Sequence, residues 1–142
     1  MNPAFWDTSA LVPLCVRQQP SPVMRRLLKQ YQIVVWWATS VEMRSAFERL
    51  LRMGQLTSPE YAAAGVRLNR LRRGWRELQP SEFLRSRAEA FLSSYALKAA
   101  DSLQLAAAWV WSAGAPQNCN FISADAQLLD AARSLGFQIV AA

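Results

Sequence analysis

The sequence predicts an α/β fold in which a short, mainly parallel sheet lies between helices. The first observation is that short apolar segments, typical of strands, alternate with longer segments that have helical spacing. The second is the unbroken apolar run from Ile33 to Trp37, which is typical of a parallel strand buried on both faces. The third is the length of 142 residues, from which we expect residues 1–142 to form a single domain.

The first half of the chain is predicted to contain two strands and four helices. The strands cover residues 4–6 and 33–37, and the helices begin near residues 10, 23, 39 and 58. The third helix ends at about Met53, before Gly54. The expected N-caps are Thr8 or Ser9 for the first helix, Thr39 or Ser40 for the third and Ser58 for the fourth.

The second half is predicted to contain three strands and three helices. A short strand at 75–78 precedes a helix at 82–94, which the segment Pro80-Ser81-Glu82 opens. A longer helix at 97–113 ends before Gly114 and Pro116. A strand at 120–123, a helix at 124–135 and a last strand at 137–140 complete the chain.

The composition is that of a folded protein with a basic surface. Hydrophobic residues make up 52% and charged residues 18%, which excludes a disordered chain. The net charge is +6, and fourteen of the sixteen basic residues are Arg. Because the guanidinium fork matches phosphate geometry, this bias favours a nucleic-acid partner. A GC-rich genome, which enriches Arg and Ala together, explains the bias equally well.

The chain has no histidine, and this excludes several chemistries. Ser-His-Asp and Cys-His catalysis and the zinc motifs that need His are all ruled out. Cys15 and Cys119 belong to no CxxC pair, and we expect two free, buried thiols. We also expect a cytoplasmic protein with no membrane association. The N-terminus has no signal-peptide pattern, and the longest mostly apolar stretch, 103–116, is too short to span a bilayer.

Four of the ten acidic residues border segments that are predicted to form the core. Asp7 and Asp125 follow predicted strands. Glu42 lies about one helical turn after the predicted strand at 33–37. Because parallel strands present their carboxyl ends at one edge, we expect these three side chains to converge there. Asp101 interrupts an alanine-rich apolar helix. Charges so placed are costly unless a cation neutralises them, and one shared divalent metal ion would explain all four.

Each acid also has a purely structural explanation. Asp7 and Asp125 fit helix caps or turns, and Glu42 near a helix start favours the helix dipole. Asp101 is the hardest to explain in this way, because it lies inside its predicted helix without a capping role. The basic residues of the fourth helix fit either a solvated face or contacts with RNA phosphates. These residues are Arg67, Arg70, Arg72 and Arg73.

The four carboxylates suit metal-dependent hydrolysis of a phosphodiester. Oxygen ligands prefer hard ions such as Mg²⁺ or Mn²⁺, which activate water and stabilise an in-line displacement without histidine. A phosphatase that uses Asp7 as its nucleophile is a weaker alternative. That chemistry usually needs a second Asp two residues later, where this chain has Ser9.

Four segments in order resemble a PIN domain, in particular the VapC-type toxin ribonuclease of type II toxin–antitoxin pairs. They are Asp7–Leu11, Val41-Glu42, Leu97–Ala106 and Phe121–Asp125, and the resemblance spans nearly the whole chain. It implies a three-layer α/β/α sandwich with a short parallel sheet. It also implies an endoribonuclease that uses Mg²⁺ or Mn²⁺ to cut an RNA substrate. The implied partners are a second copy in a homodimer and a small antitoxin protein.

The resemblance also assigns roles to single residues. Asp7 and Asp101 would be the principal metal ligands, and Glu42 and Asp125 would complete the acidic site. The hydroxyls of Thr8 and Ser123 would orient these carboxylates. Gln104 is a departure, because many relatives have His at this position. The alternative to an enzyme is a catalytically silent PIN-like module that binds RNA or protein.

Overall fold

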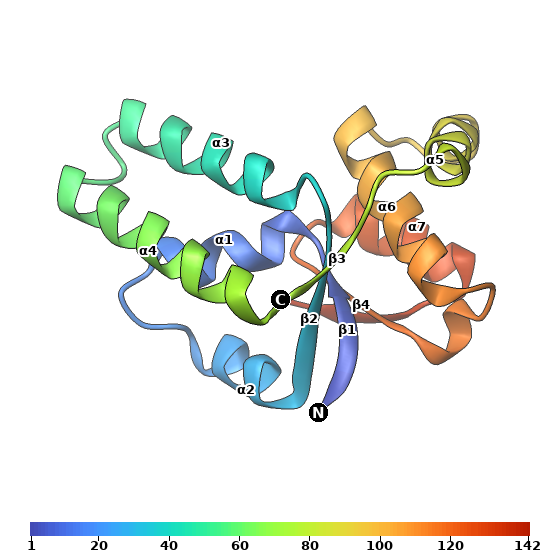
Figure 1. Ribbon diagram of the computed structural model, residues 1–142, viewed down its shortest axis with the longest axis horizontal. Helices are drawn as coiled ribbons and strands as arrows, with labels where there is room; N and C mark the ends of the chain where they lie inside the picture. The colour runs from blue at the N-terminus through green and yellow to red at the C-terminus, as the bar shows by residue number, and fades with distance from the viewer.

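The central feature of the fold is one parallel sheet between two layers of helices. The computed structural model describes all of residues 1–142. The sheet has the strand order β3-β2-β1-β4-β5, with every pair parallel. Its strands are β1 (Asn2–Trp6), β2 (Tyr31–Trp36), β3 (Arg76–Leu78), β4 (Asn120–Ser123) and β5 (Gln138–Ala141). The predicted three-layer α/β/α architecture is confirmed (Figure 1).

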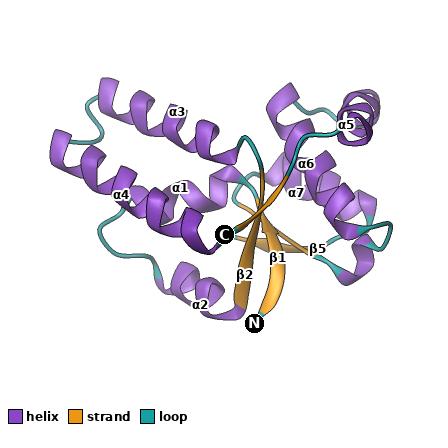
Figure 2. Cartoon of the chain, in the orientation of Figure 1, coloured by secondary structure: helices purple, strands orange, loops and turns teal.

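The helices divide by sequence into two groups, one for each face of the sheet (Figures 1 and 2). The first group is α1 (Thr8–Val16), α2 (Pro22–Gln30), α3 (Thr39–Arg52) and α4 (Ser58–Gly74). The second group is α5 (Glu82–Ser94), α6 (Ala99–Ser112) and α7 (Ala126–Leu135), with a 3-10 turn at Pro116–Asn118. None of the helices combines the length and apolar character that crossing a membrane requires.

Two hydrophobic cores form because side chains alternate between the faces of each strand. In β1, Ala4 and Trp6 point into the core beneath the first helix group, whereas Phe5 points into the other. Phe5 stacks on Phe121 of β4, with ring centroids 5.5 Å apart. The second core also contains Ala106, Ala107 and Ala108 of α6, all with 0% exposure. These small side chains let α6 pack closely against its neighbours.

The predicted elements are all present, and most boundaries shift by one or two residues. β2 begins at Tyr31 rather than Ile33, because Tyr31 already pairs with Asn2 of β1. Trp37 lies beyond the end of β2 and is about half exposed. α6 begins at Ala99 rather than Leu97, which places Asp101 in its first turn. Asp101 therefore lies inside its helix without a capping role, as expected, but nearer to the N-terminal end than predicted.

Two predicted caps are replaced by neighbouring residues. α1 is capped by Asp7 and not by Thr8 or Ser9, because its carboxylate accepts the Ser9 N–H at 3.3 Å. α4 is capped by Thr57 and not by Ser58, in a reciprocal capping box with Glu60.

The starts of α3 and α7 also differ from the prediction. α3 begins after Ala38 without any side-chain cap, since neither Thr39 nor Ser40 performs this role. α7 begins at Ala126 rather than Ala124, because Asp125 caps it. Two of the four acids therefore act as helix caps.

Candidate active site

The four predicted acids line one cleft of about 650 Å³ at the carboxyl edge of the sheet. Each stands in the first turn or at the N-cap of a different helix, and the four helices are α1, α3, α6 and α7. The helix dipoles partly offset the repulsion between the negative charges. The predicted convergence of strand-end acids at one edge is confirmed, and Asp101 joins them from α6.

Asp7 is the innermost of the four carboxylates, with only 4% of its surface exposed. Its backbone N–H extends the β1–β4 ladder by donating to Ile122 O at 3.1 Å. Burial raises the pKa of Asp7 to about 6, against hydrogen bonds from Ser123 and Ser9 that lower it. The negative charge of Asp101 adds to the increase. The carboxyl is thus held in a place where its charged form is costly.

Glu42 is held from two sides by neutral donors. The Thr8 hydroxyl donates to Glu42 Oε1 at 3.1 Å, and Gln104 Nε2 donates to Oε2 at 3.2 Å. Burial raises the pKa of Glu42, these two hydrogen bonds lower it, and the charges of Asp7 and Asp101 raise it further. The donors orient the carboxylate without neutralising it.

Gln104 connects three segments at the floor of the site. Its buried amide nitrogen also contacts Thr8 Oγ1 at 3.0 Å and Thr39 Oγ1 at 3.2 Å. Its amide oxygen is buried without any hydrogen-bond partner. The amide nitrogen has only two hydrogens for three nearby acceptors, so it cannot donate to all three at once. The amide oxygen, in contrast, has no donor. Gln104 therefore positions Thr8 and Glu42 directly, which its place in the sequence does not reveal.

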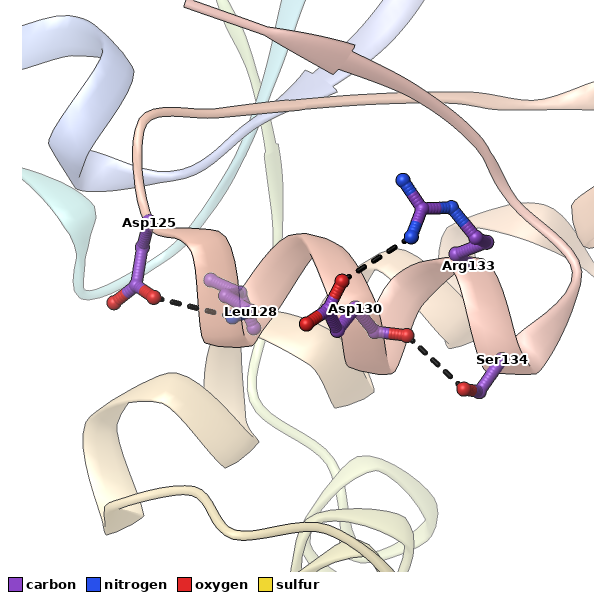
Figure 3. A network of polar contacts seen from close by, with 5 residues as sticks. All are labelled: Asp125, Leu128, Asp130, Arg133 and Ser134. Carbon is purple, nitrogen blue, oxygen red and sulfur yellow. Dashed lines mark hydrogen bonds and ion pairs between the residues drawn. The ribbon is translucent and has the colours of Figure 1, made fainter.

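Asp101 and Asp125 form the outer part of the site. Burial raises the pKa of Asp101, and so does the charge of Asp125, whereas Lys98 lowers it. Asp125 Oδ1 accepts the backbone N–H of Leu128 at 3.1 Å and so caps α7 (Figure 3). The other acid of this helix, Asp130, pairs with Arg133 on the surface. Only Asp125 of the two lies at the cleft.

Ser9 ties the two strand ends together. Its hydroxyl contacts Asp7 Oδ1 at 2.8 Å and Ser123 Oγ at 3.2 Å. It also accepts the backbone N–H of Ala124 at 2.9 Å. Ser123 Oγ in turn accepts the N–H of Asp125 at 2.9 Å. One chain of hydroxyls thus joins the β1–α1 and β4–α7 junctions.

The donor set is made of oxygen atoms only, as a hard divalent cation requires. None of the four carboxylates makes an ion pair with a basic side chain. However, no group of three acidic or cysteine side chains is gathered tightly enough to hold a metal ion as it stands. Direct ligation by all four would need side-chain rotation, and bridging water would serve the more distant ones.

The predicted RNA-binding arginines lie away from the cleft. Arg67 Nη1 donates to the carbonyl oxygen of Cys15 at 2.7 Å and so joins α4 to α1. Arg70 borders a separate hollow with Met1 and Tyr31, at the amino ends of β1 and β2. Arg72 and Arg73 lie exposed in the last turn of α4.

The basic residue that does line the cleft is Arg49 of α3. It follows Glu42 by seven residues, which is nearly two helical turns, so both lie on the same face of the helix. This spacing of seven residues from Glu42 is visible in the sequence, and it could have identified Arg49 as a residue of the cleft.

Comparisons with known proteins establish the fold alone. No family model matches the chain, and no curated protein does. It is similar in structure to PAE2754 from Pyrobaculum aerophilum, with 18% identity and a TM-score of 0.68 over 98% of this chain and 90% of that one. FitAcB from Neisseria gonorrhoeae gives 19% identity and a TM-score of 0.65, with 96% and 95% covered.

A toxin–antitoxin complex from Klebsiella pneumoniae contains a further similar chain. It gives 18% identity and a TM-score of 0.62, with 86% of each chain covered. The architecture of this chain is thus one that these solved proteins share.

Proposed function

We propose that this chain is a PIN-type endoribonuclease that uses Mg²⁺ or Mn²⁺ to hydrolyse phosphodiester bonds in RNA. The observation that carries the proposal is a cleft lined by four carboxylates, none of them in an ion pair. Asp7, Glu42 and Asp101 each have a raised pKa, for which burial is the first cause. A site that stores negative charge at this cost is suited to a cation.

The residues present fit such a cation by their chemistry. Asp7 and Asp101 are the proposed principal ligands, with Glu42 and Asp125 completing the set, in part through water. When bound, the metal would activate water and stabilise charge on the phosphate that is attacked. The hydroxyls of Ser9 and Ser123 hold Asp7, and the Thr8 hydroxyl holds Glu42.

The remaining side chains limit which group can handle the proton. With no histidine in the chain, the bases available in the cleft are the carboxylates themselves. Asp7, with a pKa of about 6, would be able to hold a proton near neutral pH when no metal is bound. The proposed proton transfers therefore need no side chain beyond these carboxylates.

The proposed biological role is that of a toxin neutralised by a small antitoxin. The support is the fold shared with a chain of the Klebsiella pneumoniae toxin–antitoxin complex, and with FitAB, whose structure was solved bound to an IR36 DNA fragment. We further propose a cytoplasmic homodimer. Measuring the size of the purified chain in solution tests the homodimer. Repeating the measurement after co-expression with the product of the adjacent reading frame tests the antitoxin.

A second candidate is a PIN-like module that binds RNA or protein without cutting. The observation that favours it is that no three acids are gathered into a ready metal site. The two candidates differ in the effect of divalent metal. An enzyme should bind Mn²⁺ through the cleft and cut RNA, whereas a silent module should do neither.

The test compares wild type with Asp7→Asn and Asp101→Asn on single-stranded RNA in Mg²⁺, in Mn²⁺ and in chelator. Asp130→Asn is the matched control, because it removes an equal charge from an exposed position on α7. We expect metal-dependent cleavage by wild type and by the control only. Mn²⁺ binding by calorimetry gives a second readout, and cleavage by either cleft variant at the wild-type rate would refute the assignment.

A further inference from the structure

We infer that Arg49 of α3 and Lys98 at the start of α6 bind phosphates of an RNA strand on opposite sides of the four carboxylates. This rests on the proposed function and names the groups that would hold its substrate. α3 and α6 lie on opposite faces of the sheet and meet at the cleft (Figure 1). A strand laid across the acids from one helix to the other would meet one of these cations on each side.

Arg49 is the only basic side chain that lines the cleft. It lies about 10.5 Å along α3 from Glu42, at a rise of about 1.5 Å per residue. Its guanidinium makes no ion pair, although four carboxylates line the same cleft. Arg49 is an exposed residue, so its donors are open to a ligand. An unpaired guanidinium beside an acidic site matches a phosphate next to the one that is cut.

The α3 face that carries Arg49 changes character along the helix. Glu42, Ser45 and Arg49 line the cleft in this order from the sheet edge outward. Arg52, three residues further on, is also exposed and unpaired. The acidic end suits a metal, and the basic end suits the backbone of a strand that leaves the site.

Lys98 stands on the other side, next to Asp101. It is the N-cap residue of α6, and its side chain makes no capping hydrogen bond. It is exposed, and its charge acts on the Asp101 carboxyl without an ion pair within 4.0 Å. An ammonium group on a flexible stem is therefore free to reach an anion at the rim of the cleft.

The two cations would offset the electrostatic repulsion between the four carboxylates and the RNA phosphates. Four carboxylates repel an RNA strand, and bound metal would offset this only at the phosphate it contacts. Flanking cations supply attraction to the neighbouring phosphates, and such contacts weaken with salt. Arg67 and Arg70 of α4 are not placed to do this, because Arg67 donates to the Cys15 carbonyl and Arg70 borders a hollow at the amino ends of β1 and β2.

The experiment measures binding of a short fluorescent single-stranded RNA by anisotropy, in chelator and at several salt concentrations. The variants are Arg49→Ala, Lys98→Ala, their double and Arg49→Lys. Arg26→Ala is the matched control, since Arg26 is an exposed and unpaired helix arginine on α2. Each single Ala variant should bind about 3- to 10-fold more weakly at low salt. The salt slope should fall by about 0.7 for each phosphate that the variant no longer neutralises.

The double variant should combine the effects of the two single variants, because the two residues belong to different helices and share no ion-pair partner. Arg49→Lys should keep most of the binding, which distinguishes a missing charge from missing packing. If both Ala variants bind like Arg26→Ala, or if wild type binds no RNA, the inference is wrong. Cleavage by wild type in Mg²⁺ or Mn²⁺ is scored separately. If RNA binding depends on Arg49 and Lys98 but no cleavage occurs, the proposed nuclease activity is refuted and this inference stands. If cleavage occurs but binding does not depend on these two residues, the nuclease activity stands and this inference is wrong.

Discussion

Two junctions of this protein have the same local plan and different electrostatics. At both, a parallel strand ends, an aspartate caps the next helix, and serine hydroxyls hold the turn. Asp7 follows Trp6 directly and is buried, whereas Asp125 is separated from β4 by the exposed Ala124 and is only half-buried. One extra residue, Ala124, forms a bend between β4 and the cap of α7, and the second carboxylate lies nearer to solvent.

The comparison teaches that a capping role and a chemical role do not exclude each other. Both aspartates satisfy backbone N–H groups of a helix start, which is the ordinary reason for an acid there. Asp7 combines this with burial that raises its pKa to about 6, whereas Asp125 is only half-buried. The depth of the carboxylate below the surface, and not the motif around it, separates a costly charge from an ordinary cap.

The largest expected difference between the junctions is in activity. Asp7→Asn should lower RNA cleavage at least about 100-fold, because it removes a charge from the proposed metal site. Asn caps helices as well as Asp does, so the fold should survive. Asp125→Asn should cause a smaller decrease, since the outer carboxylate would act through water. Equal decreases in a cleavage assay would show that the burial of each carboxylate does not determine its contribution to cleavage.

The second difference is in how stability depends on pH. In the folded state the Asp7 pKa is about 6, against an ordinary value of 3.8. The folded state therefore holds this proton more tightly, and the resulting stability is full below about pH 4. It is lost as pH rises to about 6, a change of the order of 2 to 3 kcal/mol.

Asp7→Asn should remove this part of the slope. Urea unfolding from pH 4 to 7 in chelator measures it as the difference between wild type and variant. If the two proteins lose stability in parallel, the burial of Asp7 does not set its protonation.

The third expected effect is stabilisation by metal. A cation that binds only the native state at about 100 times its Kd adds about 2.7 kcal/mol to the unfolding free energy. Mg²⁺ or Mn²⁺ should raise the Tm of wild type, and Asp101→Asn should melt higher than wild type in chelator but gain less from metal. Asp125→Asn should keep more of the metal response than Asp7→Asn. A wild-type Tm that ignores both metals would contradict the shared site.

A smaller effect should follow from cutting the link between the junctions. Ser9→Ala removes the hydroxyl that meets Asp7 and Ser123, and it leaves the Ala124 N–H without its acceptor. The expected cost is about 1 to 2 kcal/mol of stability, together with about tenfold in cleavage. Ser9→Thr, which keeps the hydroxyl, is the control. If denaturant unfolding and cleavage assays show Ser9→Ala to be like wild type, the link does not hold the two junctions together.

The smallest effect is expected at Asp130, the second acid of α7. It forms an exposed pair with Arg133, three residues along the same helix (Figure 3). Asp130→Asn should change stability by less than about 0.5 kcal/mol and leave cleavage unchanged. A marked decrease in the activity of this variant would mean that charge anywhere on α7 matters, and not the position at the cleft.

Sequence alone is sufficient for the elements and for the edge at which the acids gather. Buried parallel strands are continuous apolar runs, so Ile33–Trp36 can be recognised as a strand without any tertiary knowledge. Asp7 and Asp125 stand out because each comes shortly after an apolar segment, Ala4–Trp6 and Phe121-Ile122 respectively. The place of Asp101 in its helix is harder to predict, because α6 starts two residues later than its apolar pattern indicates.

Contacts between distant segments cannot be read in this way. Gln104 meets Thr8 and Thr39 across 96 and 65 residues, and Ser9 meets Ser123 across 114. No local pattern encodes such meetings, because they depend on strand order and helix packing together. The N-caps predicted for α1 and α4 are wrong for a related reason, since adjacent hydroxyls and carboxylates compete for the same N–H groups and geometry decides between them.

The alanines at positions 106 to 108 limit which substitutions the protein tolerates. Their side chains are fully enclosed, and α6 approaches its neighbours as closely as methyl groups allow. Larger replacements would force the layers apart at a cost of about 1 to 3 kcal/mol each. A random-mutagenesis selection for inactive alleles should therefore collect temperature-sensitive variants in this short run, among residues that carry no chemistry.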